Sequence, residues 1–413
     1  MTIRPAIATP EAPTTVENAD VTVVGGAGHV GIPLVLALAE AGLRVNVNDL
    51  NLETLDVLKS GRLPYLEDGA DGVLAKALAA KRLVFTSSPD QVSTGGPVIV
   101  TIGTPVDEFQ NPVRQVVQDC IDWMLPAVKD GQLIVLRSTV FPGTTDWVNA
   151  YLKSKGRKLQ VAFCPERVVQ GYGLKELRAM PQIVSGCTQE AERAAAELFE
   201  RIAPEVVIVT PMEAEFAKLF CNAYRYIEFA ATNEFYLVTK SAGIDYQRVM
   251  SAMKHNYPRL KSMPRPGFAA GPCLVKDTMQ LSAFARNQFG LGHAALLINE
   301  GLVLHMIDDL KRRYDLSKTT VGLLGMAFKA ESDDTRASLS YKFKNALSGQ
   351  SRAVLTTDPF VTTDPELKPL DEVITKSDVL ILCAPHAAYA KADFKGKPVF
   401  DIWGELKGAN VIR

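Results

Sequence analysis

The chain has 413 residues, enough for two or three domains, and 47% of them are hydrophobic, which supports sizeable cores and excludes disorder for most of its length. Its 45 basic residues balance 46 acidic ones, which gives no electrostatic argument for binding nucleic acid or an anionic membrane. No apolar run reaches the roughly 18 residues of a transmembrane helix.

Residues 1–19 are predicted to form a flexible tail, because they contain three prolines and lack the apolar segment of a signal peptide. The six cysteines are far apart, with neither a CxxC pair nor the spacing of a zinc site. This cysteine usage indicates a reducing, cytoplasmic location and predicts no metal site.

Residues 20–210 are predicted to form a Rossmann domain. Strand Val21–Val24 is followed by a glycine-rich turn, a helix over Ile32–Ala41 and a second strand at Val45–Val47. Further apolar runs alternate with helical segments such as Val116–Val128, and the runs are Val98–Ile102, Leu133–Leu136, Val161–Phe163 and Val206–Val209. This alternation predicts a mostly parallel sheet with helices on both faces.

Residues 211–316 are predicted to form a helical domain. A long helix spans Glu213–Ala242, and a second helical stretch runs over Thr278–Tyr314 with mild breaks at its glycines, Gly290, Gly292 and Gly301. Long helices with two apolar faces commonly pack against a second subunit, so we expect a homodimer.

Residues 317–413 return to strand–helix alternation, which predicts a smaller Rossmann-like domain. We expect a helix over Ser338–Leu347 and strands at Val321–Leu324, Val354–Thr356, Val379–Cys383 and Phe400–Trp403. The predicted fold is therefore α/β, with two Rossmann-like domains joined by a helical central region that contains a long connecting helix.

A GxGxxG pattern occupies the predicted turn after the first strand. Gly26 allows the tight turn, Gly28 allows close approach to a pyrophosphate, and Gly31 allows the helix to pack on the strand. Asp49, 23 residues beyond Gly26, can accept hydrogen bonds from a ribose diol and would repel a 2′-phosphate. The pattern favours NAD, while a structural turn or a site for another adenosine ligand, such as S-adenosylmethionine, stays open.

Proline and glycine surround Cys273 in the segment from Arg265 to Asp277. A cysteine in such a loop, beside the cation of Lys276, can have a lowered pKa and act as a nucleophile. The alternative for any single cysteine is a small buried hydrophobic residue.

Several sequence blocks occur in the order found in one enzyme family. They are the cofactor loop, Ile102-Gly-Thr-Pro105, Ser138-Thr-Val-Phe-Pro-Gly143, Cys164-Pro-Glu-Arg167, Lys218-Leu-Phe-Cys-Asn222, Gly271-Pro-Cys-Leu-Val-Lys-Asp277 and Phe328-Lys-Ala-Glu-Ser-Asp-Asp-Thr-Arg336. From about Asp20 to the C-terminus the chain resembles the UDP-glucose/GDP-mannose dehydrogenase family. Each block alone is weak evidence, but together in this order they are highly specific.

The resemblance implies a four-electron oxidation of the C6 hydroxyl of a UDP-sugar. The alcohol gives a hydride to NAD, and the thiolate of Cys273 adds to the resulting aldehyde. The thiohemiacetal gives a second hydride and becomes a thioester, which water hydrolyses to the carboxylate. The nucleophile is needed because an aldehyde cannot give up a hydride until its carbon becomes tetrahedral.

The resemblance also implies roles for individual residues. Lys218 and Asn222 would stabilise negative charge on the C6 oxygen, Asp277 would position a water or proton, and Glu166 and Thr139 would orient the hydrolytic water, with Glu166 as candidate general base. The implied NAD contacts are Gly26, Gly28, His29, Val30, Gly31, Asp49, Thr104, Thr139, Lys276 and Arg336. The implied substrate contacts are Glu166, Arg167, Lys218, Asn222, Arg259, Gly267, Ala270 and Lys329.

The same residues have simpler interpretations outside the family context. Lys218 and Asn222 four residues apart would form a solvated helix face, Glu166 and Arg167 a loop ion pair, and the acids before Arg336 a helix N-cap.

The chain departs from the family at Ala270, which adds a methyl group where the family commonly has glycine and a backbone approaches ligand.

The substrate and the reaction class also keep alternatives. The segment Asn256–Arg259 resembles the branch that acts on UDP-N-acetylhexosamines, whereas Lys276-Asp277 is closer to the UDP-glucose and GDP-mannose branches. We favour a UDP-N-acetylhexosamine, with UDP-glucose next. A two-electron β-hydroxyacid dehydrogenase would use a Rossmann domain and a lysine without the cysteine loop. A sugar-nucleotide-binding protein without catalysis would bind and form no NADH.

Overall fold

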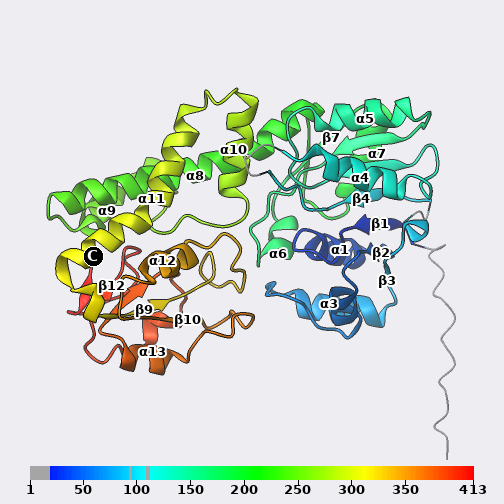
Figure 1. Ribbon diagram of the computed structural model, residues 1–413. Helices are drawn as coiled ribbons and strands as arrows, with labels where there is room; N and C mark the ends of the chain where they lie inside the picture. The colour runs from blue at the N-terminus through cyan, green and yellow to red at the C-terminus, as the bar shows by residue number, and fades with distance from the viewer. Residues whose placement is uncertain (1–18, 93–94, 108–111) are drawn as a thin grey trace, which may run out of the picture. The chain divides into compact units, whose positions relative to one another are not determined.

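The computed structural model describes residues 19–92, 95–107 and 112–413, so almost all of the predicted tail lies outside the described residues. The chain divides into two compact units (Figure 1). The first comprises residues up to Thr104, Arg114–Ser138 and Gly143–Ala214, and the second comprises Pro105–Val113, Thr139–Pro142 and Glu215–Arg413.

The first unit is built on an eight-stranded sheet in the order β3-β2-β1-β4-β5-β6-β7-β8, parallel except between β6 and β7. Its strands are β1 Val21–Val24, β2 Val45–Asn48, β3 Leu83–Thr86, β4 Val98–Val100, β5 Leu133–Leu136, β6 Gln160–Phe163, β7 Gln182–Gly186 and β8 Val206–Ile208. Its helices are α1 Gly31–Glu40, α2 Leu52–Lys59, α3 Ala70–Ala79, α4 Arg114–Met124, α5 Thr144–Ser154, α6 Gly173–Leu177 and α7 Gln189–Phe199. The prediction of a mostly parallel sheet is confirmed.

Apolar runs become central strands in this unit because both faces of the sheet are covered. All residues of β1 and β5 are buried, as expected for parallel strands between helical layers. Helix α1 is buried along its whole length except at Glu40, because it packs on the sheet and against α3 and α6. Its N-terminus follows β1 directly, and this places the glycine turn at the carboxyl edge of the sheet.

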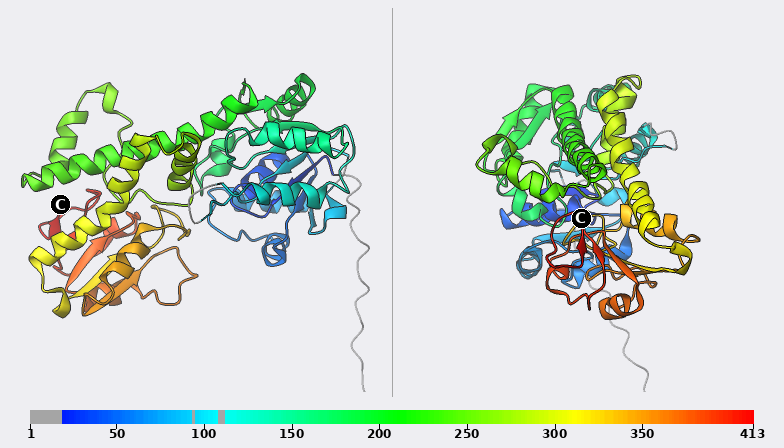
Figure 2. Two further views of the ribbon diagram at one scale, coloured as in Figure 1. Left: turned by 45° about the horizontal axis from the view of Figure 1, so that its top comes forward. Right: turned by 90° about the vertical axis from the view of Figure 1, so that its left-hand side faces the viewer.

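The second unit joins a group of helices to a five-stranded parallel sheet in the order β10-β9-β11-β12-β13. Its helices are α8 Pro211–Ser241 (which starts in the first unit), α9 Tyr246–Lys254, α10 Leu274–Phe284, α11 Gly290–Arg313, α12 Leu339–Leu347 and α13 Leu370–Lys376. Its strands are β9 Thr320–Leu324, β10 Ala353–Thr357, β11 Val379–Leu382, β12 Val399–Phe400 and β13 Val411–Ile412. Figure 2 shows α8 as one continuous helix, as its lack of proline and glycine predicts.

The predicted second helical stretch is two helices, whose break covers residues 285–289 and ends at Gly290, while the breaks expected at Gly292 and Gly301 are wrong. The chain leaves α10 at Ala285, where Arg286 and Asn287 adopt left-handed backbone angles with φ of 53° and 60°. Gly290 is the first residue of α11, whereas Gly301 lies inside it, and so does Gly292, where a Cβ atom would come within 2.6 Å of the Phe289 ring. The break is therefore made by a closed turn, and Gly292 serves close packing.

Helix α11 has the length and mean hydropathy, 1.3 over its most apolar window, of a membrane-spanning helix. In this structure 39% of that window is buried, and Leu302, Val303 and Leu310 lie with residues of α12 and β9 in one apolar cluster. Composition alone does not separate these two uses of a long helix.

Candidate active site

The candidate nucleophile lies where a glycine-rich loop meets α10. Cys273 is the residue before the first turn of α10, and it is exposed. Gly271 precedes it with φ of 108°, and a Cβ atom there would come within 2.7 Å of the Phe328 ring. Glycine is thus required at 271, both for its backbone angle and for contact with the segment that carries Lys329.

The methyl group of Ala270 faces apolar neighbours. The residue is 8% exposed and lies in the apolar cluster that contains Phe268 and Phe343. Its methyl group therefore packs into the core of the second unit, where it adds apolar contact to the loop.

Buried polar side chains from α8 and α10 meet next to the cysteine. Lys218 and Asn222 of α8 are 8% and 7% exposed, so the solvated-face interpretation is wrong. The Asn222 amide donates a 2.6 Å hydrogen bond to Oδ2 of the fully buried Asp277. Lys276 Nζ lies 3.0 Å from Asp277 Oδ1, which accepts no hydrogen bond from any residue that the structure describes.

The pKa of the Cys273 thiol is raised, which reverses the expected direction. Burial by surrounding protein is the largest cause, even though the residue reaches the surface, and the negative charge of Asp277 adds to it. Lys218, Lys276 and Arg336 act in the opposite direction without outweighing these two causes. The thiol is therefore the resting form, and its proton has to leave when the sulfur attacks.

The segment after β9 brings Lys329 and Arg336 to the second unit's sheet edge. Arg336 forms a bidentate pair with the buried Asp334, in which Nε donates to Oδ1 at 3.0 Å and Nη2 donates to Oδ2 at 2.7 Å. The helix that follows is capped by Ser338, whose hydroxyl accepts the Ser340 N–H, so the interpretation of the preceding acids as the N-cap is wrong. Asp334 instead holds the Arg336 guanidinium.

The cofactor loop of the first unit has the geometry that a dinucleotide needs. A Cβ atom at Gly26 would come 2.8 Å from the Val23 carbonyl, and one at Gly31 would overlap Gly25 and Gly26, whereas one at Gly28 would make an ordinary 3.4 Å contact with the Gly25 carbonyl oxygen. Asp49 follows β2, and its two oxygens accept one backbone N–H each, from Asn51 and Ala27, at 2.9 and 3.0 Å. Each oxygen keeps a lone pair that a ribose hydroxyl could use.

Two other residues of this loop have side-chain or helix-end roles. The His29 ring is tilted by 38° against the Tyr65 ring at a centroid distance of 4.0 Å, and its Nδ1 lies 3.1 Å from the Gln170 amide nitrogen. Val30 is the residue before the first turn of α1. These contacts fix the side of the loop next to Gly28.

Glu166 lies in the first unit and is 7% exposed. The sequence missed its partner, which is Arg137 at the end of β5: Nη2 lies 2.5 Å from Glu166 Oε2. The backbone N–H groups of Arg167 and Val168 donate to Oε1 at 2.7 and 2.9 Å. The expected ion pair thus exists with a different arginine, while the guanidinium of Arg167 donates to the Pro181 carbonyl.

The other predicted residues have their own surroundings. Arg259 stacks on Tyr257, and Gly267 exchanges two hydrogen bonds with the buried Asn233 at 2.7 and 3.0 Å. Thr104 belongs to the first unit, and Thr139 lies in a short segment of the second unit in which the Phe141 ring contacts Phe284 of α10 at 5.8 Å. No group of three or more potential metal ligands occurs among residues 19–92, 95–107 and 112–413.

Comparison with known proteins covers most of the chain. Residues 19–203 match the NAD-binding domain of the UDP-glucose/GDP-mannose dehydrogenase family, residues 212–300 its central domain and residues 322–407 its UDP-binding domain. A UDP-N-acetyl-D-mannosamine dehydrogenase of Pyrococcus horikoshii is 27% identical over 90% of each chain. An NDP-N-acetyl-D-galactosaminuronic acid dehydrogenase of Ralstonia nicotianae is 26% identical over 90% of this chain and 92% of its own.

Solved structures agree with these matches. The Pyrococcus horikoshii enzyme's structure has a TM-score of 0.86 at 26% identity, covering 94% of this chain and 96% of its own. A UDP-N-acetyl-mannosamine dehydrogenase from Staphylococcus aureus has a TM-score of 0.82 at 25% identity, covering 95% and 97%. The chain therefore belongs to the UDP-glucose/GDP-mannose dehydrogenase family, a family of NAD-dependent nucleotide-sugar dehydrogenases.

Proposed function

We propose that this NAD-dependent UDP-sugar dehydrogenase oxidises the C6 hydroxyl of a UDP-N-acetylhexosamine to the carboxylate through a covalent intermediate on Cys273. The observation that carries the proposal is the buried hydrogen bond between Asn222 and Asp277, next to a reactive residue type at the start of α10. Structural packing alone gives no reason to bury Lys218, Asn222 and Asp277 together beside an exposed thiol.

The residues divide the chemistry between them. NAD, when bound, accepts one hydride at each of two oxidation steps. Lys218 and the Asn222 side chain would stabilise the C6 oxygen as it gains negative charge. The Cys273 sulfur would form a C–S bond to the aldehyde carbon, while its proton leaves to the C6 oxygen or to solvent. Loss of the second hydride leaves a thioester, and water then restores the thiol and releases the carboxylate.

Asp277 is the group that we propose to hold the hydrolytic water. Its Oδ2 is occupied by Asn222, but Oδ1 has an ion pair with Lys276 and no hydrogen bond within the described residues. A buried carboxylate oxygen in this state is a favourable site for an ordered water. Lys276 would keep the carboxylate in place while the water approaches the thioester.

Glu166 and Thr139 are proposed to orient the hydrolytic water, as the family resemblance implies. Arg137 already occupies one oxygen of Glu166 and two backbone N–H groups occupy the other, so we assign Glu166 an orienting role in preference to that of general base. The residues that stay proposed substrate contacts are Arg167, Arg259, Gly267, Ala270 and Lys329, and those that stay proposed NAD contacts are Thr104, Lys276 and Arg336.

The choice of sugar rests on the relatives. Those named above act, by their names, on UDP-N-acetyl-D-mannosamine or an NDP-N-acetyl-D-galactosaminuronic acid, and the same branch is favoured by Asn256–Arg259. UDP-glucose is the next candidate. The proposed location is the cytoplasm, where NAD and nucleotide sugars are available.

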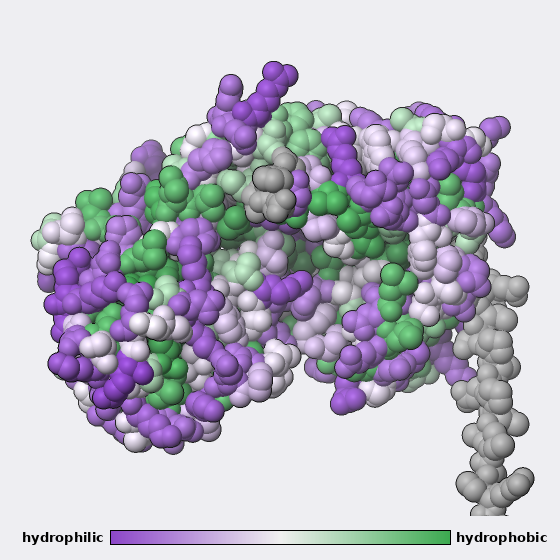
Figure 3. All heavy atoms as spheres, viewed as in Figure 1, coloured by the Kyte–Doolittle hydropathy of each residue, from purple (hydrophilic) through white to green (hydrophobic). Residues whose placement is uncertain are grey.

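A homodimer is proposed from an apolar stripe on α8. Phe220, Tyr224, Phe235 and Val238 are between 46% and 64% exposed and fall within about 60° of one another around the helix. Leu297 and Leu304 of α11 are also exposed, and Figure 3 shows apolar patches interrupting the hydrophilic surface over these helices. Aromatic and aliphatic side chains at this spacing are typical of a helix face buried against a second subunit.

The test is NADH formation by purified protein with NAD and a panel of UDP-N-acetylhexosamines, UDP-glucose and GDP-mannose. We expect two NADH per sugar consumed with one of the UDP-N-acetylhexosamines, and none of the carboxylate product from Cys273→Ser. One NADH per sugar, unaffected by that substitution, would overturn the covalent mechanism. Binding without NADH formation would support a non-catalytic protein.

A further inference from the structure

The two Rossmann-like sheets each place an aspartate directly after their second strand. Asp49 follows β2, and Asp358 follows β10. Each accepts backbone N–H groups from the loop after the first strand of its sheet: Ala27 donates to Asp49 at 3.0 Å, and Met326 and Ala327 donate to Asp358 at 2.6 and 3.0 Å. The two acids are therefore equivalent in topology.

They differ in what remains available for a ligand. Asp49 is half-buried with one donor on each oxygen. The Asp358 side chain is fully buried, and its Oδ2 accepts a third donor, His386 Nε2, at 3.1 Å. Its Oδ1 accepts the N–H groups of Phe360 and Val361 at 2.8 and 3.0 Å. Five donors exceed the roughly four lone-pair sites of a carboxylate, so Asp358 cannot also bind a ribose diol.

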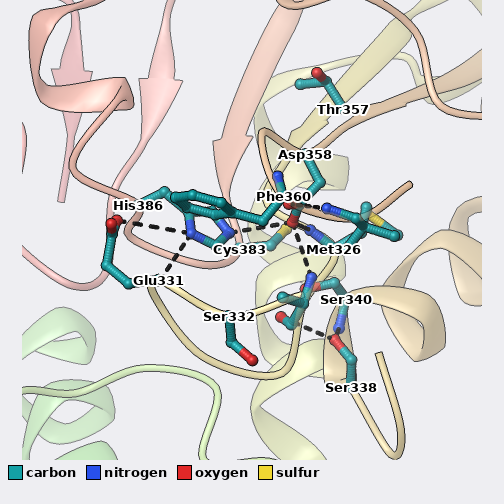
Figure 4. Close-up of polar contacts among 12 residues, drawn as sticks. Met326, Glu331, Ser332, Ser338, Ser340, Thr357, Asp358, Phe360, Cys383 and His386 are labelled. Carbon is teal, nitrogen blue, oxygen red and sulfur yellow. Dashed lines mark hydrogen bonds and ion pairs between the residues drawn. The ribbon is translucent and has the colours of Figure 1, made fainter. Parts of the chain in front are cut away.

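His386 connects this acid to the segment that carries Lys329 (Figure 4). Its Nδ1 accepts the Glu331 backbone N–H at 3.0 Å, which leaves the proton on Nε2 for the hydrogen bond to Asp358. The ring is buried between Phe360 and Tyr389, with centroid distances of 5.1 and 5.7 Å. Both ring nitrogens of His386 are thus hydrogen-bonded to protein groups, and these bonds fix the position of the ring.

Glu331 needs this support because of its backbone. Its φ of 52° is in the left-handed region, which costs a residue with a side chain about 1 kcal/mol or more. His386 holds its N–H, and its carboxylate accepts the Ala387 N–H at 2.7 Å. Phe328, on the other side of Lys329, contacts Gly271 of the cysteine loop, so the segment is fixed at both ends around the lysine.

We propose that Asp358 and His386 are positioning residues, which hold residues 326–334 so that Lys329 contacts the sugar nucleotide. The second unit then binds its nucleotide without the aspartate–ribose contact that is available at Asp49. The inference rests on the proposed role of Lys329 as a substrate contact. At Asp358 the ring of His386 donates the hydrogen bond that a ribose hydroxyl would donate at Asp49. The loop after β9 would therefore hold Lys329 in place and would not bind a ribose through its aspartate.

The test compares the two aspartates in the full-length protein by calorimetry with UDP and, separately, with NAD. Asp358→Asn and His386→Phe should weaken UDP binding by roughly 10- to 100-fold, as expected for a displaced contact loop, and leave NAD affinity within about twofold. Asp49→Asn should give the opposite pattern. In turnover, the His386 variant should raise KM for the UDP-sugar more than it lowers kcat.

Two conservative variants separate the hydrogen bonds of His386. His386→Asn can still accept the Glu331 N–H, whereas His386→Gln can still donate to Asp358. Because the first bond reaches the Lys329 segment directly, His386→Asn should rescue UDP binding better than His386→Gln. Loss of UDP and NAD affinity together, or UDP binding unchanged in His386→Phe, would overturn the inference. Failure of the wild-type protein to bind UDP would instead count against the proposed substrate class, and this inference would fall with it.

Discussion

The guanidinium of Arg137 lies 2.5 Å from the carboxylate of Glu166, and the arginine side chain is completely buried. Its second amino group donates to the Cys164 carbonyl and to the Gln182 amide oxygen, both at 3.1 Å. The Arg137 guanidinium thereby connects the ends of three neighbouring strands, β5, β6 and β7. Glu166 owes its position to this arrangement, because its own loop supplies only backbone donors.

Replacing Arg137 should therefore lower the stability of the fold. Arg137→Met leaves the Glu166 carboxylate buried without its partner, and we expect the free energy of unfolding to fall by about 3–5 kcal/mol. Arg193→Met is the matched control, because Arg193 is 77% exposed and its pair with Glu197 spans 3.9 Å. Denaturant unfolding would measure both. Adding Glu166→Gln to Arg137→Met should recover part of the loss, and equal costs for the two single variants would contradict the prediction.

The sequence predicts the order of elements well where burial and periodicity agree. Fully buried strands such as β1 and β5 are continuous apolar runs, and α8 has helical spacing without interruption. Short strands such as β3 and β7 were not predicted, since half-buried residues and polar ends weaken their signal. The break between α10 and α11 depends on left-handed Arg286 and Asn287, which no local composition indicates.

Asp49 provides a test of cofactor choice. Asp49→Asn keeps the hydrogen-bonding oxygen but removes the charge that favours a ribose diol and repels a 2′-phosphate. We expect KM for NAD to rise roughly tenfold, which corresponds to about 1.4 kcal/mol, and discrimination against NADP to decrease. Steady-state kinetics with both cofactors measures this. An unchanged ratio of the two kcat/KM values would show that Asp49 does not contact the ribose.

Asp358 should make stability depend on pH in the acid range. Burial acts to raise the pKa of this carboxyl, but His386 and the backbone donors lower it to about 2, below the ordinary value of 3.8. A depressed pKa stabilises the fold above the ordinary value, and this contribution is lost as the pH falls toward 2. The difference in unfolding free energy between wild type and Asp358→Asn should shrink by about 2 kcal/mol between pH 5 and 2. A constant difference across that range would contradict the assignment.

The apolar stripe on α8 predicts a change in assembly. Phe235→Glu places a charge in the proposed subunit contact and should convert a dimer to a monomer in light scattering. Arg225→Glu is the control, because Arg225 is exposed on the same helix about 140° away from Phe220. A monomeric wild type, or equal effects from both variants, would remove the proposed dimer surface.

The candidate site was only partly predictable for a physical reason. Helical spacing predicts that Lys218 and Asn222 share a face, and the structure adds that this face is buried against Asp277. Arg137 and His386 were missed because their partners are far away in sequence, although an arginine directly after the apolar run of β5 is a usable signal. The sign of the Cys273 pKa shift was wrong because sequence shows neighbouring charges but not burial.

Asp277 offers the sharpest test of the cysteine's environment. Its charge contributes to the raised pKa of Cys273, so Asp277→Asn should lower that pKa and shift the pH midpoint of Cys273 alkylation by iodoacetamide downward. Lys276→Met should shift the midpoint upward, because Lys276 acts in the opposite direction. Alkylation of the Cys273 peptide is followed by mass spectrometry in a Cys221→Ser background, since Cys221 is also exposed.

In Asp277→Asn the turnover number should fall, although the Cys273 thiol ionises more easily. Although Asp277→Asn makes the thiolate easier to form, it removes the carboxylate that we propose to hold the hydrolytic water, so kcat should fall by roughly 100-fold or more. An acyl-enzyme should then accumulate on Cys273 and be visible as added mass. If the alkylation midpoint stays fixed or rises in Asp277→Asn, the carboxylate does not act on the sulfur. If kcat is unaffected, thioester hydrolysis uses another group.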